Sequence, residues 1–237
     1  MHAADRSTVE QARRLLGDCV LFKGLSPGDR ADLVARARIR NYPAGETIFL
    51  MGSSGDSMMA VLDGTIRISV PSPEGKEIVL AIIQPGEVFG EIALLDGKER
   101  TAEATAMTDC TLAVLERRDV LSFLEAHPGG WPRLVDLLCA RLRHSDRQIA
   151  EMAFLQLPVR LAKALLRMAD MAAGLAGARA GARIRLTQRE LGNIVGMTRE
   201  SVNKCLREWQ RKGIIRVEDN AIIIVKRDKL EEVAHTG

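Results

Sequence analysis

Residues 89–102, FGEIALLDGKERTA, hold side chains that together would suit a sugar joined to a phosphate. Gly90 lets the backbone approach a ligand closely. A buried Glu91 carboxylate would accept a hydrogen bond from a ribose hydroxyl, while Arg100 and the neighbouring Thr101 hydroxyl would bind a phosphate. The spacing alone fits an ordinary turn with a surface ion pair equally well, so these residues by themselves leave both interpretations open.

A second stretch, residues 187–212, has the pattern of a helix-turn-helix. Gly196 and Met197 supply the turn between two expected helices, and Thr198 is placed to cap the second one. Each expected helix carries an apolar stripe at the spacing of a buried face. These stripes are formed by Leu191, Ile194 and Val195, and by Val202, Cys205, Leu206 and Trp209.

The outward face of the second expected helix carries Arg199, Glu200, Asn203, Lys204 and Arg207. Arg and Lys donate to guanine, Glu accepts from cytosine and Asn pairs with adenine. A charged outer face is usually only a solvated one, but here it coincides with a turn, a cap and two apolar stripes, which favours DNA binding. The charge distribution agrees, because residues 158–237 hold 16 basic and 9 acidic residues, a net of +7, whereas the remaining 18 basic and 22 acidic residues give −4.

Composition sets the limits for the rest of the chain. A length of 237 residues predicts two domains, and 46% hydrophobic but only 3% aromatic residues predict an aliphatic core. We find neither an apolar run of about 18 residues nor a secretory leader, so we expect a cytoplasmic protein with no membrane partner. The four cysteines are scattered, which suggests reduced thiols and neither a zinc site nor disulfides. With four histidines and no nucleophile elbow, metal spacing or P-loop, we expect no catalytic residues.

The periodicity divides the chain into four parts. Residues 1–18 are polar and expected to be helical or frayed, and residues 20–118 contain short apolar runs separated by glycines, typical of a β-barrel or roll. Residues 130–156 form an expected long helix that begins near Pro132. Pro158 interrupts or restarts it, and within the basic module that follows we expect a Gly/Ala-rich loop at 172–183 and a terminal β-hairpin wing.

The long helix has a heptad seam, in which apolar residues alternate at intervals of three and four. The seam consists of Val135, Leu138, Leu142, Ser145, Ile149, Met152 and Gln156. Packing against its own domain is the alternative to a coiled coil. We favour a homodimer, because a two-fold pair of helix-turn-helix units would meet half-sites about one DNA turn apart.

Three blocks resemble one known family over roughly residues 20–226: FGEIALLDGKERTAEATA, RLRHSDRQIAEMAFL and LTQRELGNIVGMTRESVNKCLREWQRKGII. On these blocks the chain resembles the cyclic-AMP receptor protein/FNR family of bacterial transcription regulators. The resemblance implies an α+β fold with an N-terminal antiparallel, jelly-roll-like β-roll that binds a cyclic nucleotide, a long dimerisation helix and a C-terminal winged helix-turn-helix. It places these domains at 1–130, 131–157 and 158–237. It also implies a homodimer whose partners are double-stranded DNA and RNA polymerase.

The first block resembles the phosphate-binding cassette of cyclic-nucleotide-binding domains. The resemblance implies that Glu91 binds the ribose 2′-hydroxyl and Arg100 the cyclic phosphate, with a matching partner for Glu91 at Arg141. The cofactor-binding set that it implies is Gly90, Glu91, Ile92, Arg100, Thr101, Ala102, Arg141, Ser145 and Asp146, with Ile68, Leu80 and Ile83 lining the base pocket.

Two departures from the family pattern affect ligand choice. Cyclic-AMP binders of the family usually carry a Thr-Ser pair on the long helix, where this chain has Ser145 and Asp146. Asp146 would accept from adenine N6 or from guanine N1 and N2. The Arg100-Thr101 pair resembles cyclic-GMP-binding domains more than an Arg-Ser pair does. The cofactor is therefore cyclic AMP or cyclic GMP, and cyclic AMP is favoured only by its frequency in the family.

The third block implies recognition of a palindromic TGTGA-type operator. Where the family has Arg-Glu-x-x-x-Arg, this chain has Arg199, Glu200 and Lys204, and a Lys lacks the planar fork of Arg. We therefore expect weaker discrimination at one base. The full set expected at DNA is Thr187, Arg189 and Thr198 on phosphates, with Arg199, Glu200, Ser201, Asn203 and Lys204 on the second helix.

Other regulators of this family sense different signals or act without a nucleotide. An oxygen sensor needs about four clustered thiolates for an iron–sulfur cluster, and Cys19 stands alone in the N-terminal region. A haem-based gas sensor would have His144 as its only suggestive ligand. A kinase or channel regulatory subunit would lack the block at 187–212.

Overall fold

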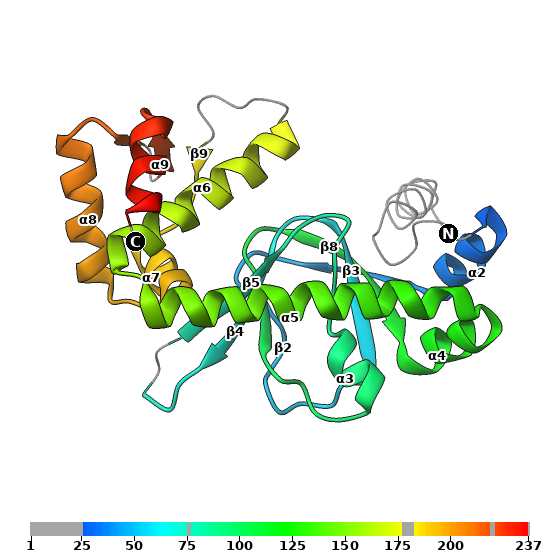
Figure 1. Cartoon of the computed structure of the whole chain (residues 1–237). Coiled ribbons are helices and arrows are strands. Elements are labelled where there is room, and N and C mark those ends of the chain that lie inside the picture. Colours follow the sequence, from blue (N-terminus) through cyan, green and yellow to red (C-terminus); the bar gives the residue numbers. More distant parts are fainter. Residues whose placement is uncertain (1–25, 75–76, 177–182, 219–220, 237) are drawn as a thin grey trace. The chain divides into compact units, whose positions relative to one another are not determined.

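The computed structural model describes residues 26–74, 77–176, 183–218 and 221–236, and Figure 1 shows the course of the chain. The chain forms two compact units. The first contains Met1–Pro71 and Leu80–Arg143, and the second contains Ser72–Val79 and His144–Gly237. The expectations for residues 1–18 and Cys19, and for residues 177–182 of the loop at 172–183, fall outside the described residues.

Two four-stranded sheets dominate the first unit. One has the order β1-β8-β3-β6 and consists of Arg38–Tyr42, Cys110–Glu116, Ser57–Asp63 and Val88–Phe89, all paired antiparallel. The other has the order β2-β7-β4-β5 and consists of Thr47–Phe49, Glu103–Ala106, Ile66–Pro71 and Glu77–Ile83. The first three residues of β5, up to Val79, are counted in the second unit. Buried residues recur along β4 and β8, as expected for strands with one face in a core. The predicted antiparallel β-roll is confirmed.

The first unit also contains helices that periodicity did not reveal. They are α2 (Pro27–Arg36), α3 (Glu91–Asp96), α4 (Arg117–Ala126) and a 3₁₀ turn at Pro128–Gly130. The apolar run at 88–95 lies within residues 20–118, where the sequence predicts a β-barrel or roll, but it divides into β6 (Val88–Phe89) and α3. Gly90 and Gly97 flank α3 with positive φ angles of 81° and 71°, and this left-handed backbone limits the helix to six residues.

Two long helices follow, with a proline as the second residue of each. These are α5 (Trp131–Phe154) and α6 (Leu157–Ala176). Pro132 and Pro158 fit there because the first turn of a helix leaves its N–H groups unpaired, and the predicted restart at Pro158 is confirmed. The predicted loop at 172–183 was wrong for residues 172–176, which complete α6, since alanine has the highest helix propensity.

The second unit is a helix-turn-helix with a small sheet. Its strands have the order β10-β11-β9 and consist of Ile215–Glu218, Ala221–Ile224 and Arg183–Ile184. Its other helices are α7 (Gln188–Val195), α8 (Arg199–Arg211) and α9 (Arg227–His235). The predicted wing is confirmed as the antiparallel β10–β11 pair, and β9 adds a strand that was not predicted.

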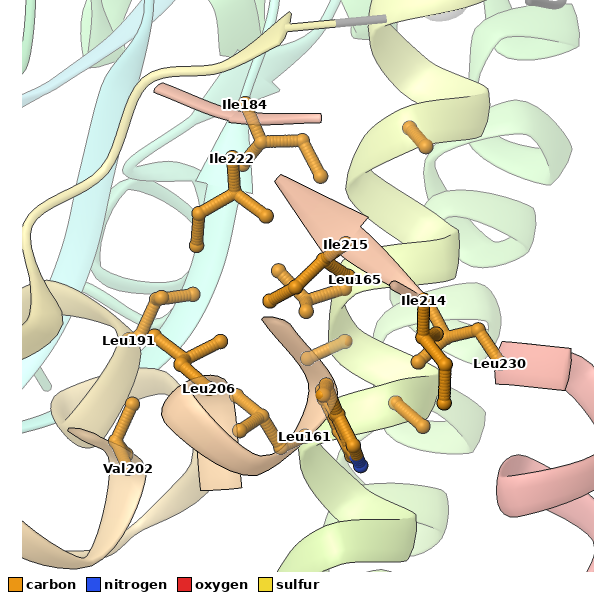
Figure 2. Close-up of a cluster of buried hydrophobic side chains, with 14 of the residues drawn as sticks. Leu161, Leu165, Ile184, Leu191, Val202, Leu206, Ile214, Ile215, Ile222 and Leu230 are labelled. Carbon is orange, nitrogen blue, oxygen red and sulfur yellow. The ribbon is translucent and has the colours of Figure 1, made fainter. Parts of the chain in front are cut away.

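Figure 2 shows the core that joins these elements. Leu161 and Leu165 of α6 lie beside Leu191 of α7 and Leu206 of α8, and Leu230 comes from α9. All five side chains are almost completely removed from solvent. Burial of an aliphatic side chain stabilises a fold by about 1.5–3 kcal/mol, so this cluster fixes the helix-turn-helix on α6.

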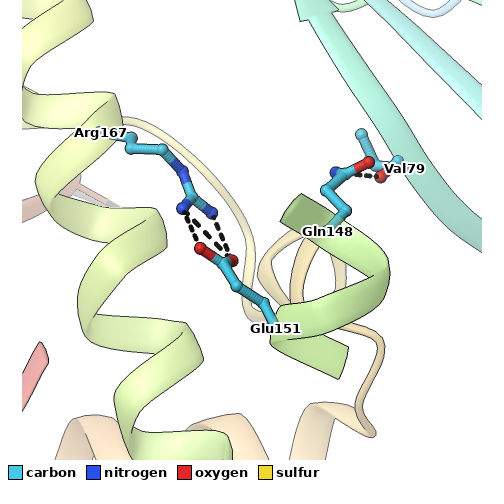
Figure 3. A network of polar contacts seen from close by, with 4 residues as sticks. All are labelled: Val79, Gln148, Glu151 and Arg167. Atoms are coloured by element: carbon cyan, nitrogen blue, oxygen red, sulfur yellow. Dashed lines mark hydrogen bonds and ion pairs between the residues drawn. The ribbon is translucent and has the colours of Figure 1, made fainter. Parts of the chain in front are cut away.

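Polar contacts tie the end of α5 to its neighbours in the second unit, as Figure 3 shows. Both nitrogens of the Arg167 fork donate to the Glu151 carboxylate at 3.0–3.4 Å. Gln148 donates to the Val79 carbonyl at 3.4 Å. Within the part of the chain that the structure describes, none of the helices combines the length and apolar character needed to cross a membrane.

Candidate ligand site and nucleic-acid interface

The candidate ligand site begins at the turn between β6 and α3. Gly90 has φ 81°, a backbone conformation that residues other than glycine rarely adopt. A Cβ at this position would lie 2.6 Å from Arg100 Nη1 and 3.3 Å from the Ser57 carbonyl oxygen. Glycine is therefore required both by the backbone conformation and by the close approach of Arg100.

Glu91, the first residue of α3, is a fully buried carboxylate. Its Oε1 lies 3.2 Å from Arg141 Nη1 on α5, and Arg141 also donates to the Val88 carbonyl. Neither carboxylate oxygen has an aligned hydrogen-bond partner among the described residues. Burial raises the pKa of Glu91, and the positive charge of Arg141 opposes this shift only in part. The buried carboxylate therefore retains the capacity to accept hydrogen bonds.

Arg100 is the second buried charge, with 5% of its surface exposed. Its Nη1 donates to the Gly90 carbonyl at 2.8 Å and its Nη2 to Ser57 Oγ at 3.1 Å. Within the described part of the chain Nε has no partner. Burial lowers the pKa of Arg100, opposed by Asp56 and Glu91, yet a guanidinium stays charged at physiological pH. A cation with an unused in-plane donor thus faces the same turn as the buried carboxylate.

Main-chain bonds hold Arg100 in position. The Gly52 amide donates to the Arg100 carbonyl, and the Arg100 amide donates to the Ser53 carbonyl, both at 2.8 Å. The next residue, Thr101, is exposed, and Ala102 is buried. The segment that carries Arg100 is therefore fastened to the turn that follows β2.

The structure brings together some predicted ligand residues and leaves others apart. Gly90, Glu91, Arg100 and Arg141 form one cluster through the contacts above. Of the predicted base-lining residues, Ile68 and Ile83 are buried, whereas Leu80 is 38% exposed. Ile92, another residue of the predicted ligand-binding set, is 41% exposed. Ser145 and Asp146 are exposed on α5, about one turn beyond Arg141. Ser57 and Phe49 were not predicted from the sequence, and they contact Arg100 from strands that are distant along the chain.

The helix-turn-helix is built by caps and by a tight turn. Thr187 and Glu190 form a reciprocal capping box at the start of α7, and the Thr198 hydroxyl accepts from the Ser201 amide at the start of α8. The predicted cap at Thr198 is confirmed. Gly196 has φ 66°, and a Cβ at Gly192 would lie 2.6 Å from the Met197 carbonyl. The sequence predicts the role of Gly196 in the turn, whereas the steric requirement at Gly192 becomes visible only in the structure.

Helix α8 separates its apolar and polar faces as predicted. Val202, Leu206 and Trp209 are buried in the core of the second unit. The predicted base readers Arg199, Glu200 and Lys204 are exposed, and Ser201 and Asn203 are partly buried. The predicted phosphate contacts Thr187, Arg189 and Thr198 are exposed on the same two helices. No group of three or more potential metal ligands occurs in the described ranges, where Cys110, Cys139 and Cys205 are free.

A β-roll with a buried carboxylate and guanidinium, followed by a helix-turn-helix, defines the class of ligand-binding DNA-binding regulators. Comparison with family models agrees with this class. Residues 39–127 match the cyclic nucleotide-binding domain, and residues 159–233 match the Crp-like helix-turn-helix domain.

Whole-chain relatives extend these matches. The chain is 31% identical over 216 residues to a CRP-like cAMP-activated global transcriptional regulator of Mycobacterium tuberculosis, covering 91% of this chain and 96% of the relative. It is 33% identical over 214 residues to the cyclic AMP receptor protein of Thermus thermophilus, with 90% and 96% covered. The crystal structure of the Thermus thermophilus catabolite activator protein matches with a TM-score of 0.52 at 32% identity, covering 91% of this chain and 98% of that one.

This protein belongs to the CRP/FNR family. The family consists of transcription regulators rather than enzymes, and the protein is accordingly a DNA-binding regulator with a nucleotide-binding domain. The resemblance predicted from the three sequence blocks is confirmed.

Proposed function

We propose that this protein is a homodimeric transcription regulator whose affinity for a palindromic TGTGA-type operator is controlled allosterically by cyclic AMP or cyclic GMP. The observation that carries the proposal is that two buried charged residues, Glu91 and Arg100, lie at the Gly90 turn. Glu91 has carboxylate oxygens without hydrogen-bond partners among the described residues, and Arg100 has a free Nε there. Unsatisfied buried polar groups are costly in a protein, and a nucleotide would satisfy both.

The chemistry of these two residues suits a cyclic nucleotide. Glu91 would accept a hydrogen bond from the ribose 2′-hydroxyl, and Arg100 would bind the cyclic phosphate through charge-assisted hydrogen bonds. Thr101 would add a hydroxyl, and the amides near Gly90 and Ala102 would add donors. Arg141 would orient Glu91, because it is the cation next to that carboxylate. Ile68, Leu80, Ile83 and Ile92 would supply apolar contacts.

Cyclic AMP is the favoured ligand because relatives at 31% and 33% identity are named for cyclic AMP. Ser145 and Asp146 would meet the base. A carboxylate at Asp146 accepts equally from adenine N6 and from the guanine N1 and N2 donors, so calorimetry with both nucleotides is the direct comparison.

The exposed seam of α5 supports a homodimer. Val135, Leu142 and Ile149 follow one another at seven-residue intervals and are 54%, 63% and 66% exposed in the single chain. Large aliphatic side chains on one helix face are typical of a coiled-coil interface. We propose the functional boundaries 1–130, 131–157 and 158–237 for the nucleotide domain, the dimerisation helix and the DNA-binding domain.

In the proposed complex α8 lies in the major groove. Arg199, Glu200 and Lys204 would read base edges, with Ser201 and Asn203 beside them. Thr187, Arg189 and Thr198 would contact phosphates without reading sequence. Such a regulator would act in the cytoplasm, together with RNA polymerase.

A fluorescence-anisotropy titration tests the proposed function. A palindromic TGTGA-type duplex and a scrambled duplex are titrated with the full chain, with and without each nucleotide. We expect nucleotide to tighten binding to the operator, because a ligand shifts an equilibrium by its differential affinity for the two states. If neither nucleotide changes the affinity for the operator, the proposed switch is refuted. Equal affinity for the two duplexes would refute base readout.

Two alanine variants separate base readout from phosphate binding in the same assay. Arg199→Ala should cost about 1–3 kcal/mol on the operator and relax specificity at one base pair. Arg189→Ala should weaken binding to both duplexes alike and reduce the salt dependence. The opposite pattern would exchange the assigned roles.

A further inference from the structure

The buried Arg100 guanidinium lies over the face of an aromatic ring. The Cζ atom of Arg100 is 4.3 Å from the centroid of the Phe49 ring, within the range of a cation–π contact. Phe49 is the last residue of β2 and lies far from Arg100 in sequence. Phe89, which precedes Gly90, packs against Phe49 with ring centroids 5.9 Å apart. The two rings therefore connect the guanidinium with the strand that leads into the Gly90 turn.

The supports of Arg100 fall into two kinds. Gly90 and Ser57 accept hydrogen bonds from two nitrogens in the plane of the guanidinium, whereas the Phe49 ring lies against its central carbon, Cζ. With these two hydrogen bonds alone, the guanidinium plane could still rotate about the line that joins the two acceptor oxygens. A ring packed against Cζ restricts that motion, and burial strengthens the contact because a desolvated cation interacts more strongly with a ring.

We propose that Phe49 is a positioning residue for Arg100. Its ring fixes the plane of the guanidinium, and so sets the direction in which the unused Nε donor meets a ligand anion. The inference rests on the proposed function, because the anion is the phosphate of the cyclic nucleotide. A bidentate guanidinium–phosphate contact depends on the orientation of the donor plane, so loss of the ring would weaken binding without removing the charge.

The simpler explanation is that Phe49 only fills space. It packs at the edge of the core that contains Phe89 and Ile68, and any bulky apolar residue would then serve. The two explanations differ for Phe49→Leu, which keeps an apolar side chain but removes the ring face, and for Phe49→Tyr, which keeps the ring.

Calorimetric titration of the full chain with cyclic AMP and cyclic GMP tests the inference. We expect Phe49→Leu to raise the Kd of the better ligand by about five- to thirtyfold, the range of a desolvated cation–π contact, and Phe49→Tyr to bind like the parent. Phe123→Leu is the matched control, because Phe123 is a buried phenylalanine of α4 in a separate core cluster. It should bind like the parent. Parent-like affinity in Phe49→Leu would overturn the inference about Phe49. The proposed function would still stand in that case if Arg100→Leu lost nucleotide binding.

A second measurement needs no ligand. In NMR spectra of the free protein, the guanidinium protons of Arg100 should be shifted upfield by the ring current of Phe49, with the signal assigned by its loss in Arg100→Lys. We expect the shift to disappear in Phe49→Leu and to remain in Phe49→Tyr and Phe123→Leu. If the parent binds neither nucleotide, the proposed function fails, and this shift still decides whether Phe49 holds Arg100. Absence of an upfield shift in the parent would overturn the inference.

Discussion

Replacing Arg100 with leucine should separate ligand binding from folding. Arg100 is 5% exposed, so a phosphate beside it would be bound with little competition from water. A hydrogen bond to a charged group contributes about 1.5–3 kcal/mol. Two of the Arg100 nitrogens are already engaged by Gly90 and Ser57, so we count less than two full bonds and expect Arg100→Leu to cost about 2–4 kcal/mol. This corresponds to a Kd about 30- to 700-fold higher.

The same substitution should affect folding much less. It removes a buried charge with an unpaired Nε, while leaving two acceptors without their donor, and these two effects oppose each other. A net change of about 1 kcal/mol would move Tm by only about 2–4 °C.

Calorimetry with cyclic AMP and cyclic GMP, together with thermal unfolding of the free protein, measures both effects. Arg40→Leu is the matched control, because Arg40 is an exposed arginine on β1 and its loss should leave the Kd unchanged. Nucleotide binding by Arg100→Leu at the parent affinity would refute the assignment of Arg100 to the phosphate. Weak binding combined with a collapse of Tm would instead assign Arg100 a structural role.

Three further predictions concern stability, assembly and the helix cap. Burial raises the pKa of Glu91 above its ordinary 4.5, so ionising this carboxyl in the folded state costs stability at pH values above 4.5 but not below. Glu91→Gln should therefore raise Tm at pH 8, and the gain in Tm should vanish toward pH 4. A gain in Tm that does not depend on pH would contradict an origin in the buried charge. Leu142→Glu should give a monomer in sedimentation, because like charges would be buried across the two-fold axis. Ala150 is exposed and lies off the seam, so Ala150→Glu should sediment like the parent. An unchanged mass for Leu142→Glu would show that the dimer interface lies elsewhere. Thr198→Ala should destabilise the second unit by about 1 kcal/mol in urea unfolding, since it removes the bond to the Ser201 amide, and an unchanged midpoint would show that the cap is dispensable.

The sequence alone was sufficient for the helix-turn-helix. The stripe of Val202, Leu206 and Trp209 is buried as its spacing predicts, and Thr198 caps α8. These features are local, because a helix repeats every 3.6 residues and a cap joins residues three apart. The effect of Pro158 is also local, because this proline lies in the first turn of the helix that restarts there. Short-range rules failed at residues 91–96, where an apolar run within the β-region forms a helix between two glycines of positive φ.

Only the tertiary structure decided which charges are buried and what surrounds them. The spacing of Glu91 and Arg100 fits a surface ion pair as well as a ligand site, and nothing local distinguishes the two. Folding brings Arg141 of α5 to Glu91, and brings Ser57 and Phe49 to Arg100. These contacts join residues about 40–50 positions apart in sequence. They depend on strand pairing and on the packing of α5, and long-range contacts of this kind leave no periodic pattern in the sequence.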